Sequence, residues 1–395
     1  MLDLTRLLAG PYCTLLLADM GAEVTKVEPT AGEDGRSFGP PFLRGEAAMF
    51  LAVNRGKRGI AVDVTSEPGR QVLLDLARHS DVVVHNYRPD FIRRARLDYE
   101  SFAAVNPRIV YCGITAYGET GPYADKPALD PIIQAVGGAM LVSGEEGQDP
   151  VRIGIPIVDS STGMFAAISV LGALYQRDRS GVGQKIDVSL FDSLINLQLP
   201  KIMEYFALGE HQPARTVESS MAAPSRYFVG KDGAHFALSI FNNKFFSRLC
   251  AAIDLPDLPD NPAFRENADR VAHRGELAEL LQRRFGEKDA AEWVRILESA
   301  DIPVGLVNGY PELFADPALR SRPVHLNAEH PDGGVYPAIG LPFTATGAPE
   351  QPGLRTPRVG EDTRGVLRSL DYPSATIDRL VAQGVIRCDD DTQTG

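Results

Sequence analysis

An aspartate at position 159 stands between two apolar segments, 153–158 and 160–177. The first segment predicts a buried strand and the second a long helix, and α/β proteins bind ligands at such junctions. A carboxylate at this point can serve as a nucleophile. The helix N-terminus would favour its charged form, and the N–H groups there could also stabilise an oxyanion. The same pattern fits a plain helix cap, because Asp is favoured at that position.

A basic cluster follows another apolar run. Residues 81–85 predict a strand, and soon after it four arginines lie within nine residues: Arg88, Arg93, Arg94 and Arg96. Guanidinium groups match phosphate oxygens two at a time, so the cluster indicates a phosphate-binding site. Further cations that could add to it are Arg36, Arg55, Lys57 and Arg58. A solvated helix face explains the same charges, and it is the simpler interpretation for each single arginine.

A third feature is the glycine-containing loop at 118–123, which is followed by Asp130. Glycine permits a tight turn at the end of a strand. Asp130 could take part in catalysis, but the pattern favours a cap for a helix that begins at Pro131.

The sequence lacks the residues that several other kinds of site require. The turn at 10–15 has no G-x-G-x-x-G, so it does not predict a dinucleotide site. The chain has neither a P-loop nor a G-x-S-x-G nucleophile elbow. Its seven His residues show no metal-ligand spacing, so we expect no metal site. The four Cys residues lie far apart, which indicates a reducing, cytoplasmic setting rather than a disulfide framework.

The composition is that of an ordinary globular protein, with 395 residues of which 44% are hydrophobic and 23% charged. The net charge of −12 argues against nucleic acid and anionic membranes as partners. The longest apolar stretches, 7–18 and 163–175, are too short to span a bilayer. An anionic ligand would therefore need a local cationic site.

Strand and helix patterns alternate through the first half of the chain. The predicted strands are 2–8, 23–28, 59–64, 81–85, 108–115, 153–158 and 184–190, and the clearest helices are 11–21, 66–79 and 160–177. Strands separated by helices pair in parallel through right-handed crossovers. The sequence therefore predicts an α/β fold with a doubly wound parallel sheet.

The pattern changes near residue 209. A hairpin with strands 226–228 and 234–240 is predicted there, followed by helices at 244–253, 273–285 and 290–299. Residues 316–357 are rich in proline and predict a long return with short strands, after which a helix at 378–383 could rejoin the first domain. We therefore expect a large domain at 1–208 and 325–395, a linker at 209–226, and a small α+β domain at 227–324.

Together these segments resemble the class III CoA-transferases, the group of formyl-CoA transferase and carnitine CoA-transferase that also contains α-methylacyl-CoA racemase. The resemblance covers nearly the whole chain, and its motifs occur in the same order. They lie at 2–11, 17–28, 54–58, 81–89, 121–123, 159, 181–190, 270–274 and 302–308. The resemblance implies an interlocked homodimer whose chains each have a large Rossmann-like domain and a smaller α+β domain.

The resemblance also implies the substrates and the residues that handle them. The substrates would be an acyl-CoA and a carboxylic acid, with no tightly bound cofactor. Asp159 occupies the position of the nucleophile, which forms an aspartyl anhydride and then an aspartyl-CoA thioester. The positions that would contact CoA are Leu8, Ala9, Arg36, Asn86, Tyr87, Arg94 and Lys126.

The sequence departs from relatives within this group at three places. Leu8 stands where formyl-CoA transferases carry Gln, and 213–226 lacks their glycine-rich loop. Leu129 stands where the racemases carry His, and a leucine cannot take or give a proton. Two alternatives to a CoA-transferase remain: a racemase or epimerase, which would exchange the α-proton of an acyl-CoA, and a non-catalytic protein that only binds acyl-CoA.

Overall fold

A computed structural model describes residues 1–210, 221–346 and 353–389 of the chain. The chain forms two compact units. The first, which we call the sheet unit, comprises Met1–Gly137, Ile153–Met203 and Arg320–Gly395; the second unit comprises Gly138–Arg152 and Glu204–Leu319. Most of the predicted linker at 209–226, and with it most of the segment 213–226, lies outside the described residues. The domain boundaries predicted at 209 and 325 stay predictions.

A seven-stranded sheet is the centre of the sheet unit. Its spatial order is β14-β5-β2-β1-β6-β7-β8, and every neighbouring pair is parallel except β14 with β5. The strands are β1 (Leu2–Leu4), β2 (Thr25–Glu28), β5 (Arg58–Val62), β6 (Val82–His85), β7 (Val110–Thr115), β8 (Gln184–Ser189) and β14 (Ile386–Arg387). The predicted parallel α/β sheet is confirmed.

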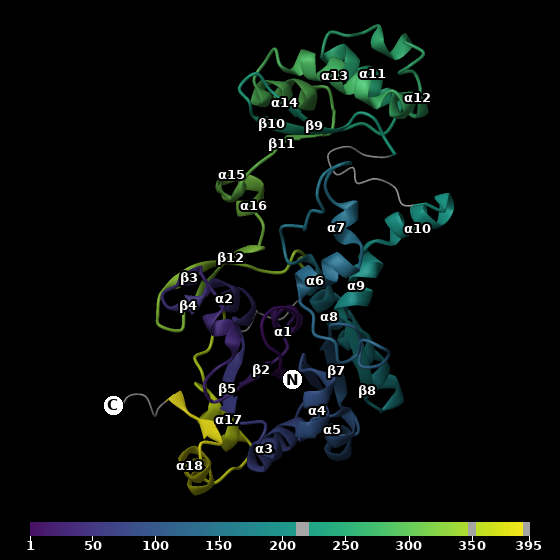
Figure 1. The fold of residues 1–395 in the computed structure, drawn as a ribbon. Helices are drawn as coiled ribbons and strands as arrows, with labels where there is room; N and C mark the ends of the chain where they lie inside the picture. Colours follow the sequence, from purple (N-terminus) through teal and green to yellow (C-terminus); the bar gives the residue numbers. More distant parts are fainter. Residues whose placement is uncertain (211–220, 347–352, 390–395) are drawn as a thin grey trace. The chain divides into compact units, whose positions relative to one another are not determined.

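Helices connect these strands and cover the sheet (Figure 1). They are α1 (Ala9–Asp19), α2 (Ala48–Asn54), α3 (Glu67–Arg78), α4 (Pro89–Ala95), α5 (Tyr99–Val105), α6 (Asp130–Val136), α8 (Ile157–Ser180) and α9 (Leu190–Leu197). The start of α3 shows how closely local rules hold. Ser66 accepts a hydrogen bond from the N–H of Gly69 at 3.2 Å, and Pro68 occupies the first turn.

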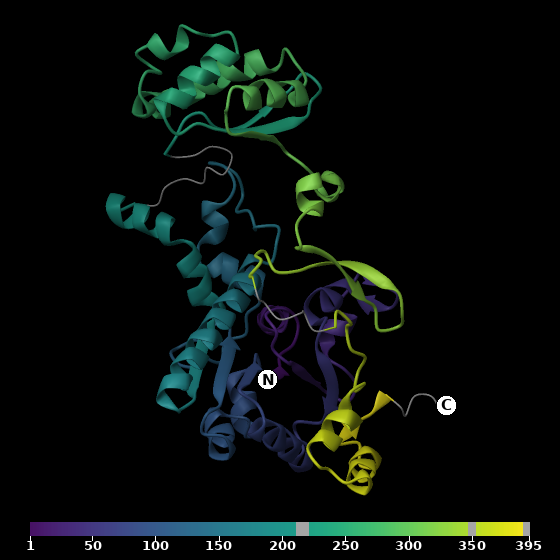
Figure 2. The same cartoon turned by 180° about the vertical axis from the view of Figure 1, so that it is seen from behind.

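The C-terminal helices α17 (Thr363–Ser369) and α18 (Ser374–Ala382) return to the β5 edge of the sheet (Figures 1 and 2). Ile377 and Leu380 of α18 are buried in the same core as Val62 of β5. The prediction that the last helix rejoins the first domain is confirmed. The remaining short elements are η1 (Asp34–Ser37), the hairpin β3–β4 (Phe42–Leu43, Glu46–Ala47) and the hairpin β12–β13 (His325–Glu329, Val335–Ile339).

The second unit has its own core. Its antiparallel sheet contains β9 (Ser225–Val229), β10 (His235–Ser239) and β11 (Val304–Leu306), with Trp293 and Phe285 among the buried side chains. The predicted hairpin and the three predicted helices are confirmed. The helices of this part of the chain are α7 (Ala139–Val142), α10 (Leu199–Leu208), α11 (Asn243–Ala252), η2 (Leu258–Asp260), α12 (Asn267–Ala272), α13 (Arg274–Phe285), α14 (Ala290–Ser299), α15 (Tyr310–Ala315) and α16 (Pro317–Arg320).

Two sequence predictions near the candidate nucleophile are wrong. Residues 153–156 form no strand, and α8 begins at Ile157 rather than at Ser160. Gly154 and Pro156 explain the difference, because glycine weakens a strand and proline has no N–H for a ladder. Asp159 is therefore the third residue of α8 and not its cap.

Helix α8 is the one described helix that is long and apolar enough to cross a membrane by length and composition. The helix extends beyond residues 163–175, the apolar stretch that we judged too short to span a bilayer. In its most apolar window, 44% of the residues are buried inside the protein, and a core helix of a globular protein passes the same test. The finding is therefore weak support for a membrane span.

The contact between α1 and α8 is unusually close. A Cβ atom added at Gly163 of α8 would lie 2.7 Å from the carbonyl oxygen of Ala9 and 3.0 Å from the ring of Tyr12. The glycine therefore lets the backbones of the two helices touch. This contact brings the first turn of α8 next to the first turn of α1.

We expect Gly163→Ala to lower the free energy of unfolding by about 1–3 kcal/mol, because α1 and α8 must separate to admit the methyl group. Urea unfolding followed by circular dichroism measures the change. Gly365→Ala in α17 is the control in another helix of the sheet unit, since nothing lies within 4 Å of an added Cβ there. The control should leave stability unchanged or raise it by up to about 1 kcal/mol. Equal stability of both variants would contradict the close contact.

Candidate active site at the carboxyl ends of β1, β6 and β7

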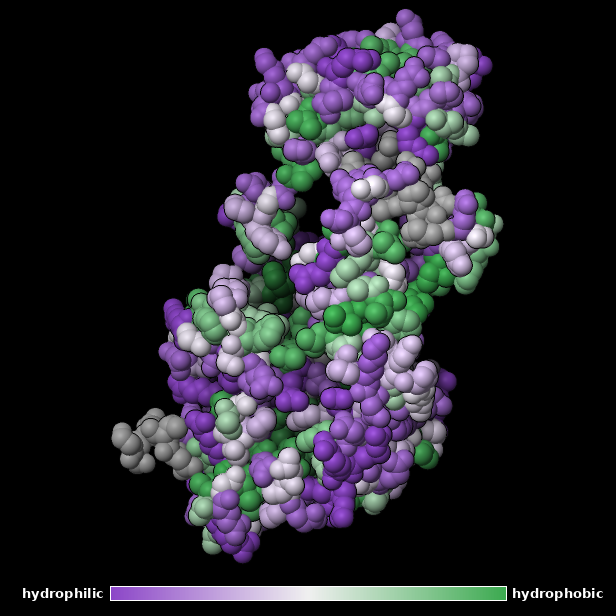
Figure 3. All heavy atoms as spheres, in the orientation of Figure 1, coloured by the Kyte–Doolittle hydropathy of each residue, from purple (hydrophilic) through white to green (hydrophobic). Residues whose placement is uncertain are grey.

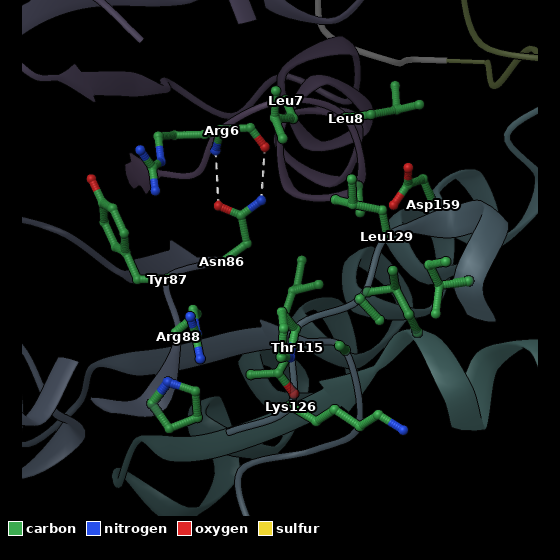
Figure 4. A pocket seen from close by; sticks show the side chains of 18 of the residues that line it. Arg6, Leu7, Leu8, Asn86, Tyr87, Arg88, Thr115, Lys126, Leu129 and Asp159 are labelled. Carbon is green, nitrogen blue, oxygen red and sulfur yellow. Dashed lines mark hydrogen bonds between the residues drawn. The ribbon is translucent and has the colours of Figure 1, made fainter. Parts of the chain in front are cut away.

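A pocket of about 470 Å³ lies where β1, β6 and β7 end. From β1 the chain continues to β2 on one side, whereas β6 joins β1 on the other side, so the strand order reverses between β1 and β6. Such a switch point is where open α/β sheets bind ligands. The pocket is lined by residues 6–9 after β1, 86–89 after β6, 114–116 at the end of β7, and by 124, 126–129, 132, 159 and 190 (Figure 4).

The wall after β1 is fixed by a side-chain clamp. Asn86 donates from Nδ2 to the carbonyl oxygen of Arg6 at 2.7 Å, and its Oδ1 accepts from the N–H of Arg6 at 2.9 Å (Figure 4). The next N–H, that of Leu7, donates to Glu33 at 2.9 Å. Leu7 has a φ of 65°, a conformation that is rare for a leucine. These bonds hold the strained turn that presents Leu8 and Ala9 to the pocket.

Buried charged side chains hold the beginning of the same turn. The Asp3 carboxylate accepts hydrogen bonds from Thr5, from the hydroxyl of Thr14 at 2.6 Å, and from the ammonium group of Lys57 at 2.9 Å. Lys26 donates to the carbonyl oxygen of Thr5 at 3.0 Å. Burial acts to raise the pKa of Asp3, but Lys57, Lys26 and the two hydroxyls outweigh it and lower the pKa to about 2. The turn thus begins at a charged, fully bonded anchor.

Asp159 lies at one end of the pocket beside Leu8 and Leu129, while Arg6, Tyr87 and Arg88 lie at the other end (Figure 4). Among the described residues, neither oxygen of its carboxylate has a hydrogen-bond partner. Burial, with the negative charge of Asp130 as a second cause, raises the pKa of Asp159 to about 7. We expected the helix N-terminus to favour the charged form, and this expectation is wrong in direction.

Asp130 occupies the N-terminus of α8 and thereby adds to the effect of burial on the pKa of Asp159. Its Oδ2 accepts from the N–H groups of Val158 at 2.8 Å and Asp159 at 3.2 Å. The next N–H, that of Ser160, donates to the carbonyl oxygen of Pro156 at 3.0 Å. The predicted cap for a helix beginning at Pro131 is therefore wrong, because Asp130 is the first residue of α6 and its side chain caps α8 instead. The N–H groups that we expected to stabilise an oxyanion are already bonded.

The structure brings most of the predicted contact residues together. Leu8, Ala9, Asn86, Tyr87, Lys126 and Asp159 all line the pocket. Arg36 does not line it, since its guanidinium binds Glu28 at 2.7 Å and Glu46 at 3.2 Å. Arg94 does not line it either, and its side chain is 75% exposed and pairs with Asp90 at 3.2 Å. The CoA contacts that the resemblance implies for Arg36 and Arg94 stay predictions.

Three cationic side chains line the pocket. Arg6 lies over the ring of Tyr87 at 5.0 Å, and the ammonium group of Lys126 lies 4.8 Å from the ring of Tyr123. Arg88 donates to the carbonyl oxygen of Asp125 at 2.7 Å. Arg6 was not among the predicted contact residues, because the predicted strand ran from 2 to 8 and included it, whereas β1 ends at Leu4. Within the described residues, no group of His, Cys, Asp and Glu could hold a metal ion.

Comparison with known proteins gives the family. The model of CoA-transferase family III matches residues 1–363. The succinyl-CoA:glutarate CoA-transferase of Mus musculus is 36% identical over 98% of this chain and 88% of its own, and the succinate–glutarate CoA-transferase of Agrobacterium fabrum is 34% identical over 94% of each. A solved CAIB/BAIF family protein from Brucella suis superposes with a TM-score of 0.84 at 34% identity, over 93% of this chain and 97% of that one. The chain belongs to CoA-transferase family III.

We expect Asn86→Ala to loosen the turn after β1, because the N–H and the carbonyl group of Arg6 both lose their partner, at a cost of about 1–3 kcal/mol. Hydrogen exchange at residues 6–10 should become faster. Asn106→Ala is the matched control, since Asn106 also donates to two backbone carbonyl groups, those of Ala77 at 3.0 Å and Ser80 at 2.8 Å. Similar exchange at 6–10 in both variants would show that the clamp does not hold this turn.

Proposed function

We propose that this enzyme transfers CoA from an acyl-CoA thioester to a carboxylic acid, with Asp159 as the covalent nucleophile. The observation that carries the proposal is the placement of Asp159 at the apolar end of a pocket on the sheet's switch point, with no hydrogen-bond partner for its carboxylate among the described residues. Such a carboxylate is free to attack a carbonyl group. Membership of CoA-transferase family III supports the same reaction.

The reaction runs through two anhydrides and one enzyme-bound thioester. An oxygen of Asp159 attacks the thioester carbon, the C–S bond breaks, and the sulfur leaves as the CoA thiolate. The thiolate then attacks the Asp159 carbonyl carbon, the bond to the donor acid breaks, and an aspartyl-CoA thioester remains. The acceptor carboxylate attacks this thioester, releasing the thiolate and forming a second anhydride. The thiolate finally attacks the acceptor's acyl carbon and returns the Asp159 carboxylate.

The pocket offers groups for each part of this sequence. Ala9, which lines the pocket, is the first residue of α1, and the N–H groups of a first helical turn have no acceptor within the helix. They are therefore suited to an oxyanion at the reacting carbon. Leu8 and Leu129 lie beside Asp159, so apolar side chains flank the reacting end (Figure 4). The cations at the other end suit the phosphates of CoA.

The names of relatives point to short dicarboxylic acids as substrates. Two are named for succinate and glutarate, and a relative from Acetobacter aceti, 33% identical over 95% of each chain, is named acetyl-CoA:oxalate CoA-transferase. We therefore place the acceptor among small carboxylic acids of this class. Leu129 lines the pocket beside Asp159, so a two-base racemase would lack its second proton carrier.

We place the enzyme in the cytoplasm. None of its four cysteines forms a disulfide, and all four are buried. Reduced cysteines are typical of reducing compartments.

We expect Asp159→Asn to reduce CoA transfer by at least about 10⁴-fold, because the amide is not a nucleophile. Incubation with succinyl-CoA, trapping with hydroxylamine and peptide mass spectrometry should find the modification at Asp159 in the wild-type protein. Asp159→Ala guards against deamidation of the asparagine variant. Asp192→Asn, in the neighbouring helix α9 and outside the pocket, should retain both transfer and trapping. Undiminished transfer by Asp159→Asn, or a modification at another residue, would refute the assignment.

We further propose that the chain acts as a homodimer. Met164, Ile168, Leu171 and Tyr175 recur at helical spacing along one side of α8, and the side chains of Ile168 and Tyr175 are 64% and 62% exposed. Hydrophobic atoms also gather over α6 and α9 (Figure 3), where Ile132, Val136, Ile195 and Leu197 are exposed. Apolar surface of this extent marks an interaction site. The resemblance to a family of dimers makes a second copy its occupant.

Sedimentation should therefore give the wild-type protein twice the chain mass of 42.8 kDa. Ile168→Glu should shift it toward the monomer, since a carboxylate would be buried in the interface without a partner. Gln176→Glu places the same group at an exposed position near the end of α8 and should leave the dimer intact. A wild-type monomer at working concentration would rule the dimer out.

A further inference from the structure

We propose that Asp130 is a positioning residue that sets the charge state of Asp159 and favours its acylation. This inference rests on the proposed role of Asp159 as nucleophile. The geometry behind it is the placement of two carboxylates at the start of one helix, of which one takes the helix N–H groups and the other takes none.

Asp130 is held as an acceptor by three donors. They are the N–H groups of Val158 and Asp159 and the side-chain amide of Gln134, which donates to Oδ1 at 2.7 Å. Asp130 is only 6% exposed. A carboxylate can accept all three bonds, whereas a protonated carboxyl would give up acceptor capacity to carry its proton.

Gln134 fixes the orientation of Asp130. Its Oε1 accepts from the N–H of Ile153 at 2.9 Å, while its Nε2 binds Asp130. Ile153 is the residue at which the chain re-enters the sheet unit, four residues before α8 begins. Gln134 of α6 thus connects the residue Ile153, which precedes α8, to the Asp130 carboxylate, which caps α8.

The cap does not stabilise the charged form of Asp159. The two nearest N–H groups point to Asp130, and the charge of Asp130 opposes a second negative charge beside it. Helix α8 packs against α1, α6, α9, β7 and β8. The titratable groups on those elements are Tyr12, Cys13, Asp19, Asp130, Asp192, Tyr111, Cys112, Lys185 and Asp187. Of these, only Asp130 adds to the effect of burial in raising the pKa of Asp159.

Acylation relieves this repulsion. The Asp159 carboxylate is negatively charged before attack. In the anhydride that charge has moved to the CoA thiolate, and in the thioester it has moved to the released donor carboxylate, so Asp159 carries it in neither covalent state. Asp130 therefore raises the free energy of the unreacted carboxylate relative to both covalent states. An unpaired, more basic carboxylate is also the stronger nucleophile once it is ionised. The two aspartates therefore have different roles: Asp130 accepts the N–H groups of α8, and Asp159 faces the pocket.

The test is the pH dependence of aspartyl trapping in a single turnover with succinyl-CoA, from about pH 5 to about pH 9. For the wild-type protein the yield should rise with pH through a midpoint of about 7, since only the ionised form of Asp159 attacks. Asp130→Asn keeps an oxygen that can accept from the α8 N–H groups but removes the charge. Its midpoint should fall by about one pH unit, and its trapping rate above the midpoint should fall by about 10-fold.

Asp98→Asn is the matched control. Asp98 caps α5 through the N–H of Ser101 at 2.9 Å and lies outside the pocket, so its midpoint should equal that of the wild type. Asp130→Ser supplies a second neutral cap should the asparagine variant fail to fold. If both neutral variants form the aspartyl adduct with the same pH midpoint as the wild type, the proposed role of Asp130 is wrong. Absence of any adduct in the wild type overturns the proposed nucleophile itself, and with it this inference.

Discussion

The close contact between α1 and α8 governs the geometry of the site. It exists because Gly163 has no side chain to keep the carbonyl group of Ala9 away. Helix α1 follows strand β1, whereas α8 follows the irregular segment 153–156, yet the first turns of the two helices meet at the pocket. One contributes Leu8 and Ala9, and the other contributes Asp159. A methyl group at this contact would move the carboxylate and the turn relative to each other, and covalent chemistry is sensitive to displacements of that size.

Buried charges hold the opposite side of the same turn. Asp3, Lys57 and Lys26 are almost completely removed from water, and such groups contribute little net stability even when they are paired. Their bonds are directed, however, and they end on the backbone of Thr5 and on the side chain of Thr14. Together with Asn86, they specify one conformation for residues 5–7, including the left-handed Leu7. The network therefore serves position more than stability.

Local sequence patterns predicted most of the helices and strands but not which of them contact one another. The strands at 82–85 and 110–115, the helix α3 and the hairpin β9–β10 follow from apolar runs, caps and turn glycines. Asp159 and Asn86 were predicted through resemblance, which carries three-dimensional information that spacing lacks. The partner of Asp130 could not be predicted, because a capping rule sees only the next few residues and α8 begins 27 residues later. Arg6 was missed for a related reason, since its place in the pocket depends on β1 lying next to β6.

Electrostatics divides the pocket into two ends that favour different states of the reaction. Arg6 and Arg88 lie at the end of the pocket opposite Asp159, where the proposed function places the polyanionic part of CoA (Figure 4). At the apolar end, a free carboxylate beside Asp130 is unfavourable, and the proposed conversion of Asp159 to an anhydride or a thioester would remove the charge from Asp159. In the proposed reaction, binding of CoA at the cationic end would hold the thiolate near the carbonyl carbon, while Asp130 disfavours return of the acylated Asp159 to a free carboxylate. A site with a neutral cap on α8 would still bind CoA but would lose this bias toward the covalent state.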